Sequence, residues 1–171
     1  VFQLSPLPAP FLQNLPDLWA RMAAMLAVLP SLHTAAPDAV VAIEVRNVEL
    51  LTPDFARVLK AAGATYCLGL HPRLPPVQEQ LPLLRALWPG PLVCRWNLHA
   101  RHGAQGYEEA KGLYEPFDKL VDPDPSTRDV LAKVMAATAA AGHNVYVTIN
   151  NKAEGSAPLS VLALATKLGS A

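Results

Sequence analysis

Four segments of the chain alternate polar and apolar positions, which is the pattern of a β-strand whose two faces meet different surroundings. These segments span residues 40–47, 65–71, 92–99 and 144–150. Their shared polar phase carries, in chain order, Glu44, Arg46, His71, Arg95, Asn97, His99 and Asn150. Side chains of a strand point to opposite faces with period two, so each segment predicts one polar and one apolar face.

Helical patterns separate these strands and repeat the order strand, helix along the chain. We expect strands at residues 1–4, 40–46, 65–70, 92–98 and 145–150. We expect helices at residues 11–29 (closed by Pro30), 53–62, 77–87, near 105–113, 125–141 and 156–168. The signals for the second helix are the clearest, because Thr52 is a good cap, Pro53 suits the first turn and Gly63 suits the end.

Strands that alternate with helices predict an α/β fold with a parallel sheet and right-handed crossovers. A doubly wound sheet is covered on both faces, and its strands are apolar on both sides. A barrel packs one face against helices and encloses the other, where polar groups can gather at the C-terminal mouth. The one-sided polar phases favour the barrel. The pattern contains only about five strand–helix units, whereas a closed barrel of this kind has about eight.

The composition limits the classes of function. The chain has 171 residues, 51% of them hydrophobic and 16% charged, with a formal net charge of zero. This size suits one domain over residues 1–171, and the charge balance predicts neither nucleic-acid nor membrane binding. Cys67 and Cys94 lie on opposite strand phases, so we expect reduced buried thiols and a cytoplasmic protein.

Several motifs together resemble the C-terminal part of the YecE-like TIM-barrel family of unknown function. They are Gln3-Leu4-Ser5-Pro6, Glu44-Val45-Arg46, Arg95-Trp96-Asn97-Leu98 and Asn150-Asn151 followed by a helix of small residues. The resemblance implies a barrel fold with a site at its C-terminal mouth, and it implies no reaction. Asn97 stands where the family usually has His, and the family's first strands and helices are absent. We therefore expect a truncated, partial (βα)8 barrel.

Five strands would leave two sheet edges with unpaired backbone groups, which attract other strands unless they are covered. We expect a homodimer that forms through these edges, since closed symmetric dimers are the commonest oligomers. An open sheet with rearranged helices is the alternative. A stable, folded monomer in dilute solution would contradict the dimer.

The charged groups on the polar phase predict a site, with two readings left open. Glu44 and Arg46 either form a buried structural ion pair or give a general acid or base tuned by Arg46 and Arg95. A guanidinium such as Arg95 suits a carboxylate or phosphate, because its donors match two oxygens at once. His99 is the candidate for proton transfer, and a solvated loop histidine is its alternative.

Other candidates are less specific. His71 ends a strand and faces the same mouth, and with Glu44 and His99 it could provide three ligands for a divalent metal. Nearby arginines oppose this, so metal and cofactor stay unknown. Asn150 and Asn151 either donate to a substrate oxyanion or form a turn, for which Asn is favoured. The long segment 100–125 is either a lid or a surface insertion.

These observations predict a hydrolase of anionic esters of the phosphoester type. Glu44 and His99 would be catalytic, and the substrate would contact Arg46, Arg95, Asn97, His71, Asn150 and Asn151. The alternative is a binding module without catalysis, which uses the same arginines for an acidic small metabolite or sugar phosphate.

Overall fold

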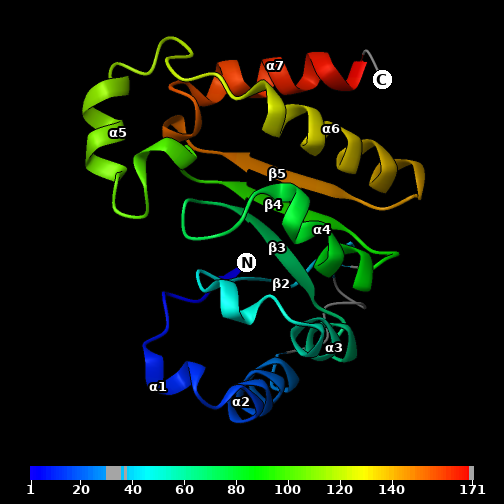
Figure 1. Ribbon diagram of the computed structural model, residues 1–171. Helices are drawn as coiled ribbons and strands as arrows, with labels where there is room; N and C mark the ends of the chain where they lie inside the picture. The colour runs from blue at the N-terminus through cyan, green and yellow to red at the C-terminus, as the bar shows by residue number, and fades with distance from the viewer. Residues whose placement is uncertain (30–35, 37, 170–171) are drawn as a thin grey trace.

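Five parallel strands form one sheet in the computed structural model, which describes residues 1–29, 36 and 38–169 (Figure 1). The strands are β1 (Phe2–Gln3), β2 (Ala42–Glu44), β3 (Thr65–Leu70), β4 (Leu92–Trp96) and β5 (Val145–Ile149). Their order in the sheet is the order in the chain, and every neighbouring pair is parallel. The predicted α/β fold with a parallel sheet is therefore confirmed.

Seven α-helices and three short 3-10 helices connect the strands within the described residues. The α-helices are α1 (Ala9–Leu12), α2 (Leu15–Ala27), α3 (Pro53–Ala61), α4 (Val77–Ala86), α5 (Tyr107–Tyr114), α6 (Pro125–Ala140) and α7 (Ala157–Gly169). The 3-10 helices are η1 (Val48–Leu50), η2 (Ala100–His102) and η3 (Asn151–Ala153).

The predicted helix starts at Thr52 and Asp124 are confirmed by their caps. The Thr52 hydroxyl accepts from the Phe55 N–H at 3.2 Å, and the Asp124 carboxylate accepts from the Thr127 N–H at 2.9 Å. Each cap satisfies a backbone donor that has no partner inside the helix. A proline follows each cap, where its missing N–H costs nothing.

The prediction of one helix over residues 11–29 is wrong, because α1 and α2 are separate. Asn14 caps α2, and Pro16 follows in its first turn. A proline inside a continuous helix would remove a hydrogen bond and clash with the carbonyl four residues earlier. Pro30, the predicted end of this helix, lies outside the described residues.

The apolar strand phases pack against the helices as expected. Ile43, Tyr66 and Cys94 belong to one core together with Trp19 of α2, Phe55 of α3, Leu83 of α4 and residues of α6 and α7. Figure 1 shows the larger helices following one another along the sheet, while α5 lies beyond the ends of the strands. The polar phases are left on the opposite face of the sheet.

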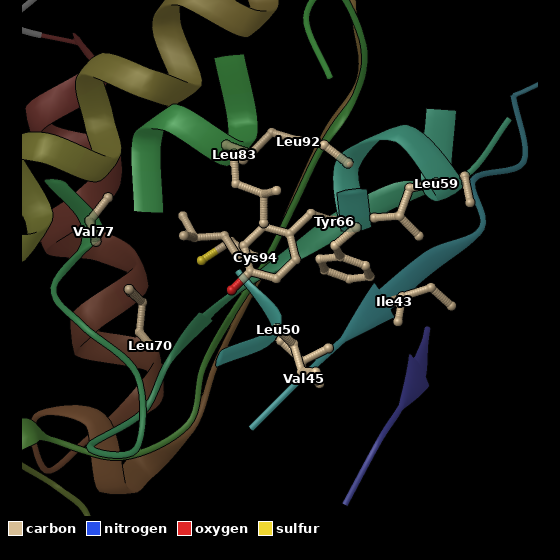
Figure 2. Packing of buried hydrophobic residues seen from close by; sticks show 14 of the residues in the cluster. Ile43, Val45, Leu50, Leu59, Tyr66, Leu70, Val77, Leu83, Leu92 and Cys94 are labelled. Carbon is tan, nitrogen blue, oxygen red and sulfur yellow. The ribbon is translucent and has the colours of Figure 1, made fainter. Parts of the chain in front are cut away.

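Tyr66 organises the centre of this core (Figure 2). Its ring meets Phe55 edge to face, and Phe55 stacks on Trp19 with ring centroids 5.4 Å apart. The Tyr66 hydroxyl donates to Gln80 Oε1 at 2.7 Å, and Gln80 Nε2 donates to the carbonyls of Gly69 and Pro75. This buried network fixes α4 against β3 without leaving a polar atom unsatisfied.

No helix among the described residues has both the length and the apolar character needed to cross a membrane. In the same part of the chain β1 and β5 each pair with one neighbouring strand. The homodimer through these edges stays a prediction.

The Tyr66 network predicts the cost of losing one hydroxyl. Tyr66→Phe should lower the free energy of unfolding by about 1–3 kcal/mol, because the buried Gln80 Oε1 loses its donor. Urea denaturation followed by circular dichroism measures this. Tyr146→Phe is the matched control, since the Tyr146 side chain is 44% exposed and should change stability by less than about 0.5 kcal/mol. Equal effects of the two substitutions would contradict the role given to the network.

Candidate functional site

A fully buried carboxylate, Glu44, lies at the centre of the polar face. Arg95 Nη1 donates to Glu44 Oε2 at 2.5 Å, and Asn97 Nδ2 donates to Glu44 Oε1 at 3.2 Å. Arg46 forms an ion pair with the same carboxylate. Arg95 Nη1 also donates to Gln3 Oε1 at 3.0 Å. The structure thus brings together Glu44, Arg46, Arg95 and Asn97, as the strand phases predict.

This cluster spans three strands, and β3 lies between its two halves. Glu44 ends β2 and Arg95 belongs to β4, so the side chains of β3 beneath the ion pair must be small. Gly69 pairs in register with Arg95. A Cβ atom at Gly69 would approach Arg46 Nη1 to 3.6 Å and Leu74 Cδ1 to 2.7 Å. The absence of a side chain at Gly69 therefore leaves room for Leu74, while Arg46 passes at ordinary van der Waals distance.

Two cations share one carboxylate in this cluster, so it carries a surplus positive charge. The Arg46 side chain is 6% exposed, whereas that of Arg95 is 35% exposed. Within the described residues, only Nη1 of Arg95 has a hydrogen-bond acceptor. Its Nε and Nη2 groups remain available on the open side, where Thr148 and Asn150 of the β5 segment are also exposed.

His71 lies at the edge of the same cluster, at the end of β3. Its Nδ1 accepts the Arg73 N–H at 3.1 Å, which orients the ring. Burial and the positive charges of Arg46 and Arg73 together lower the pKa of His71 from 6.5 to about 4, against the opposing effect of Glu44. The imidazole is therefore neutral at pH 7.

Tyr107 is a site residue that the strand patterns do not indicate. It begins α5, in the long segment between β4 and α6, and its ring lies 5.7 Å from that of His71. Its hydroxyl lies against the Arg46 guanidinium. Burial raises the pKa of Tyr107 while Arg46 lowers it, with a net increase, so the phenol stays neutral. A periodic pattern cannot reveal such a contact, because only tertiary packing brings α5 over the strand ends.

His99 lies in a different group of side chains, formed by the segment between β4 and α6. Its Nδ1 accepts the Arg101 N–H at 3.2 Å, and its ring meets His102 edge to face. Burial lowers the pKa of His99, and Asp124 and Asp122 oppose that effect. The carboxylates that raise its pKa therefore belong to Asp124 and Asp122, near the end of this same segment. The expectation that His99 acts together with Glu44 therefore has no support from a contact among the described residues.

A hydrogen-bonded chain continues this second group into α5. His102 Nε2 lies 2.6 Å from the Tyr114 hydroxyl, which donates to Asp122 Oδ2 at 2.6 Å. Asp122 also accepts from Arg101. Tyr114 packs with Leu98 and Ala110 in a small core of its own. These contacts hold α5, and with it Tyr107, in place.

A buried carboxylate anchors the other end of this segment. Glu154 Oε1 accepts the Asp124 N–H at 2.6 Å, and the Glu154 carbonyl accepts from Val121 and Asp122. Gly155, at φ 119°, lies beside it, and a Cβ there would come within 2.5 Å of the Lys119 carbonyl oxygen. The segment 100–125 is thus packed against the strand ends and joined to the β5–α7 connection.

The two asparagines of the Asn150-Asn151 pair have different surroundings. Asn150 Oδ1 accepts the Lys152 N–H at 2.9 Å while its side chain stays exposed at the end of β5. Asn151 Oδ1 accepts the Ala157 N–H at 2.8 Å, at the start of α7. Both oxygens are used by local turns, so within the described residues only the two amide nitrogens are left to donate to a ligand.

The described residues contain neither a cluster of metal ligands nor an activated thiol. Across the described ranges, no three His, Cys, Asp or Glu side chains lie together as ligands for a metal ion. Glu44, His71 and His99 therefore do not form the three-ligand site considered from the sequence. Both cysteines are free and buried, and burial raises the pKa of Cys67 to about 12. A thiolate nucleophile would need a lowered pKa.

Comparisons with known proteins give a family without an assigned activity. A family model described as "Protein of unknown function DUF72" matches residues 1–171. This match is consistent with the resemblance seen in the strand motifs. Searches of curated proteins and of solved structures gave no significant match.

The depressed pKa of His71 predicts a pH-dependent stability. The folded value, about 4, lies below the ordinary 6.5, so the unfolded chain binds the proton more readily. This contribution to stability is complete above about pH 6.5 and is lost as the pH falls toward about 4. His71→Gln should therefore flatten the decline in the free energy of unfolding between pH 7 and pH 4.5. Urea denaturation at several pH values measures this.

His143→Gln is the control for that experiment, because it removes a histidine from the helix-to-strand junction at the other end of the sheet and keeps His71. A His71→Gln protein with the same pH profile as the wild type would contradict the buried neutral imidazole.

Proposed function

We propose that this chain, which belongs to the DUF72 family of proteins of unknown function, binds a small anionic molecule at the C-terminal ends of its strands. The observation that carries the proposal is the surplus positive charge: Arg46 and Arg95 share one buried carboxylate, Glu44. A phosphate, sulfate or carboxylate would neutralise it. The free Nε and Nη2 groups of Arg95 have the forked geometry that binds two oxygens of such an anion.

Glu44 serves in this proposal as a positioning group. Its two oxygens are engaged by Arg46, Arg95 and Asn97, and it has no exposed surface. A carboxylate in this state holds the arginines in place and has no access to a substrate proton. The binding reading therefore fits the geometry better than general acid or base catalysis by Glu44.

We also infer that the sheet is part of a βα barrel, in which this site would lie at the mouth. Sequential strand order supports this inference, since doubly wound sheets reverse their order at a switch point. The one-sided helical covering of the sheet supports it too, because barrel strands keep their second face for the interior.

Anion binding predicts a strong dependence on Arg95. Isothermal titration calorimetry with inorganic phosphate, and separately with sulfate, should detect binding to the wild type. Arg95→Gln should weaken it at least about tenfold, because hydrogen bonds to charged groups contribute about 1.5–3 kcal/mol. Arg95→Lys should give an intermediate affinity, since it keeps the charge and loses the fork.

Arg57→Gln is the matched control for this titration. Arg57 is exposed on α3, where it pairs with Asp54, so its loss should leave phosphate affinity unchanged. The proposal fails if neither anion binds the folded wild-type protein, or if Arg57→Gln and Arg95→Gln weaken binding equally.

Hydrolysis of an anionic ester is the second candidate, and His71 favours it. Its neutral imidazole lies beside Arg46 and Tyr107, where a bound anion would be within its electrostatic reach. A pKa of about 4 makes a weak base at pH 7. The negative charge of a bound substrate would raise that pKa, so His71 would become an effective base or acid only in the complex.

The hydrolase candidate predicts different outcomes at two histidines. In a screen of phosphate and carboxylate esters, His71→Gln should lower kcat by about 10²-fold, the usual size of an acid–base contribution. His99→Gln should leave turnover unchanged, because His99 lies with Asp122 and Asp124. An NMR titration should also find the pKa of His71 raised by saturating phosphate. If the protein binds phosphate but hydrolyses none of the esters, the hydrolase candidate fails and only the binding function stands.

A further inference from the structure

A groove with apolar walls lies between α4 and α6, at the end of the sheet away from the Glu44 cluster. Its volume is about 410 Å³, within the range of pockets that bind small molecules. Leu81 and Leu84 of α4 form one wall, and Val134 and Ala137 of α6 form the other. Leu92, at the start of β4, contributes to the floor. Figure 1 shows the two helices side by side above the strands.

Apolar side chains make up most of the groove walls, which also include the Trp88 indole. Two hydroxyls border the groove, and both are engaged within the protein. The Thr138 hydroxyl donates to the Val134 carbonyl at 2.8 Å, and the Thr65 hydroxyl lies 3.5 Å from the Pro91 carbonyl. A polar molecule would lose its hydration here without compensation, whereas an apolar chain would gain by leaving water.

Two cations, one on each helix, border this apolar space. Arg85 comes from α4 and Lys133 from α6, and both are exposed. Within the part of the chain that the structure describes, neither has a carboxylate within 4.0 Å. Asp129, an acidic residue of α6, forms its ion pair with Lys167, at 2.7 Å. The groove therefore combines an apolar interior with two positively charged side chains at its rim, neither of them in an ion pair within the described residues.

We infer that this groove binds an amphipathic carboxylate of the medium-chain fatty acid type. The hydrocarbon chain would lie between the leucines of α4 and the small side chains of α6, and the carboxylate would lie between Arg85 and Lys133. The inference is independent of anion binding at Arg95, because the groove is lined by the starts of β3 and β4 and the Glu44 cluster lies at their ends.

Titration calorimetry with sodium decanoate, below its micelle concentration, tests this directly on the full chain. With saturating phosphate present to occupy the Arg95 site, we expect saturable binding of decanoate at one site, the groove. Octanoate should bind about tenfold more weakly, because two fewer methylene groups leave water. Acetate, which has the head without the chain, should not bind the groove. Decyltrimethylammonium, which has the same chain with the opposite charge, should bind more weakly than decanoate.

Variants separate the contribution of the chain from that of the charge. Ala137→Trp fills the groove from an exposed helix position and should abolish decanoate binding. The double variant Arg85→Gln/Lys133→Gln should weaken decanoate about fivefold, as expected for two exposed charge contacts, and leave decanol unaffected. Lys111→Gln on α5 is the control and should bind decanoate as the wild type does. Circular dichroism melting checks that each variant folds.

Three results would overturn the inference. The first is no saturable heat with decanoate for the folded wild type. The second is binding that survives in both Ala137→Trp and the double variant, which would indicate adsorption elsewhere. The third is a decanoate affinity that falls as the protein concentration rises, together with self-association of the protein in sedimentation experiments. This result would assign the groove to a second copy of the chain.

Discussion

A carboxylate without contact to water must be matched by opposite charge, and Glu44 imposes this constraint on the whole sheet. Removing an ion from water costs several kcal/mol even after relaxation, so a buried acid persists only with good partners. Arg46, Arg95 and Asn97 are those partners, and they come from the ends of β2 and β4. The ion pairs therefore join two strands that are not neighbours, β2 and β4, across Gly69 of β3, where a side chain would clash with Leu74.

The same constraint explains why the site has a surplus of positive charge and not a neutral ion pair. One carboxylate is shared by two guanidinium groups, and the more exposed of the two keeps donors free. Around them lie neutral polar groups, His71 and Tyr107, whose charged forms burial disfavours. A group of this composition is suited to an anion, and the buried acid keeps the arginines from turning toward solvent.

The two ends of the sheet differ in chemistry because different elements close them. At the C-terminal ends, the segment 100–125 folds over the strands and brings Tyr107 to Arg46. This segment is held by the Tyr114–Asp122 hydrogen bond and by the buried carboxylate of Glu154. At the N-terminal ends, leucines of α4 and side chains of α6 line a mostly apolar groove. Polar recognition therefore belongs to one end and apolar recognition to the other.

The strand and helix positions follow from the sequence with small errors, because period-two alternation, caps and prolines act locally. Thr52-Pro53 and Asp124-Pro125 each mark a helix start that the structure confirms. The break between α1 and α2, at Asn14-Leu15-Pro16, was missed. There the proline indicates a new helix start, whereas the long apolar run favours one continuous helix. Strand phase also grouped Glu44, Arg46, Arg95 and Asn97, since side chains of equal phase on neighbouring strands must share a face.

What the sequence alone determined is therefore the parallel α/β sheet and the membership of its polar face. Tertiary structure decided the rest: that Tyr107 joins the site, that His99 lies with Asp122 and Asp124, and that Asn151 serves a helix start. The physical reason is the separation along the chain of the residues that interact. Alternation and capping depend on residues a few positions apart, whereas the path of segment 100–125 depends on contacts between distant parts of the chain, which no local pattern encodes.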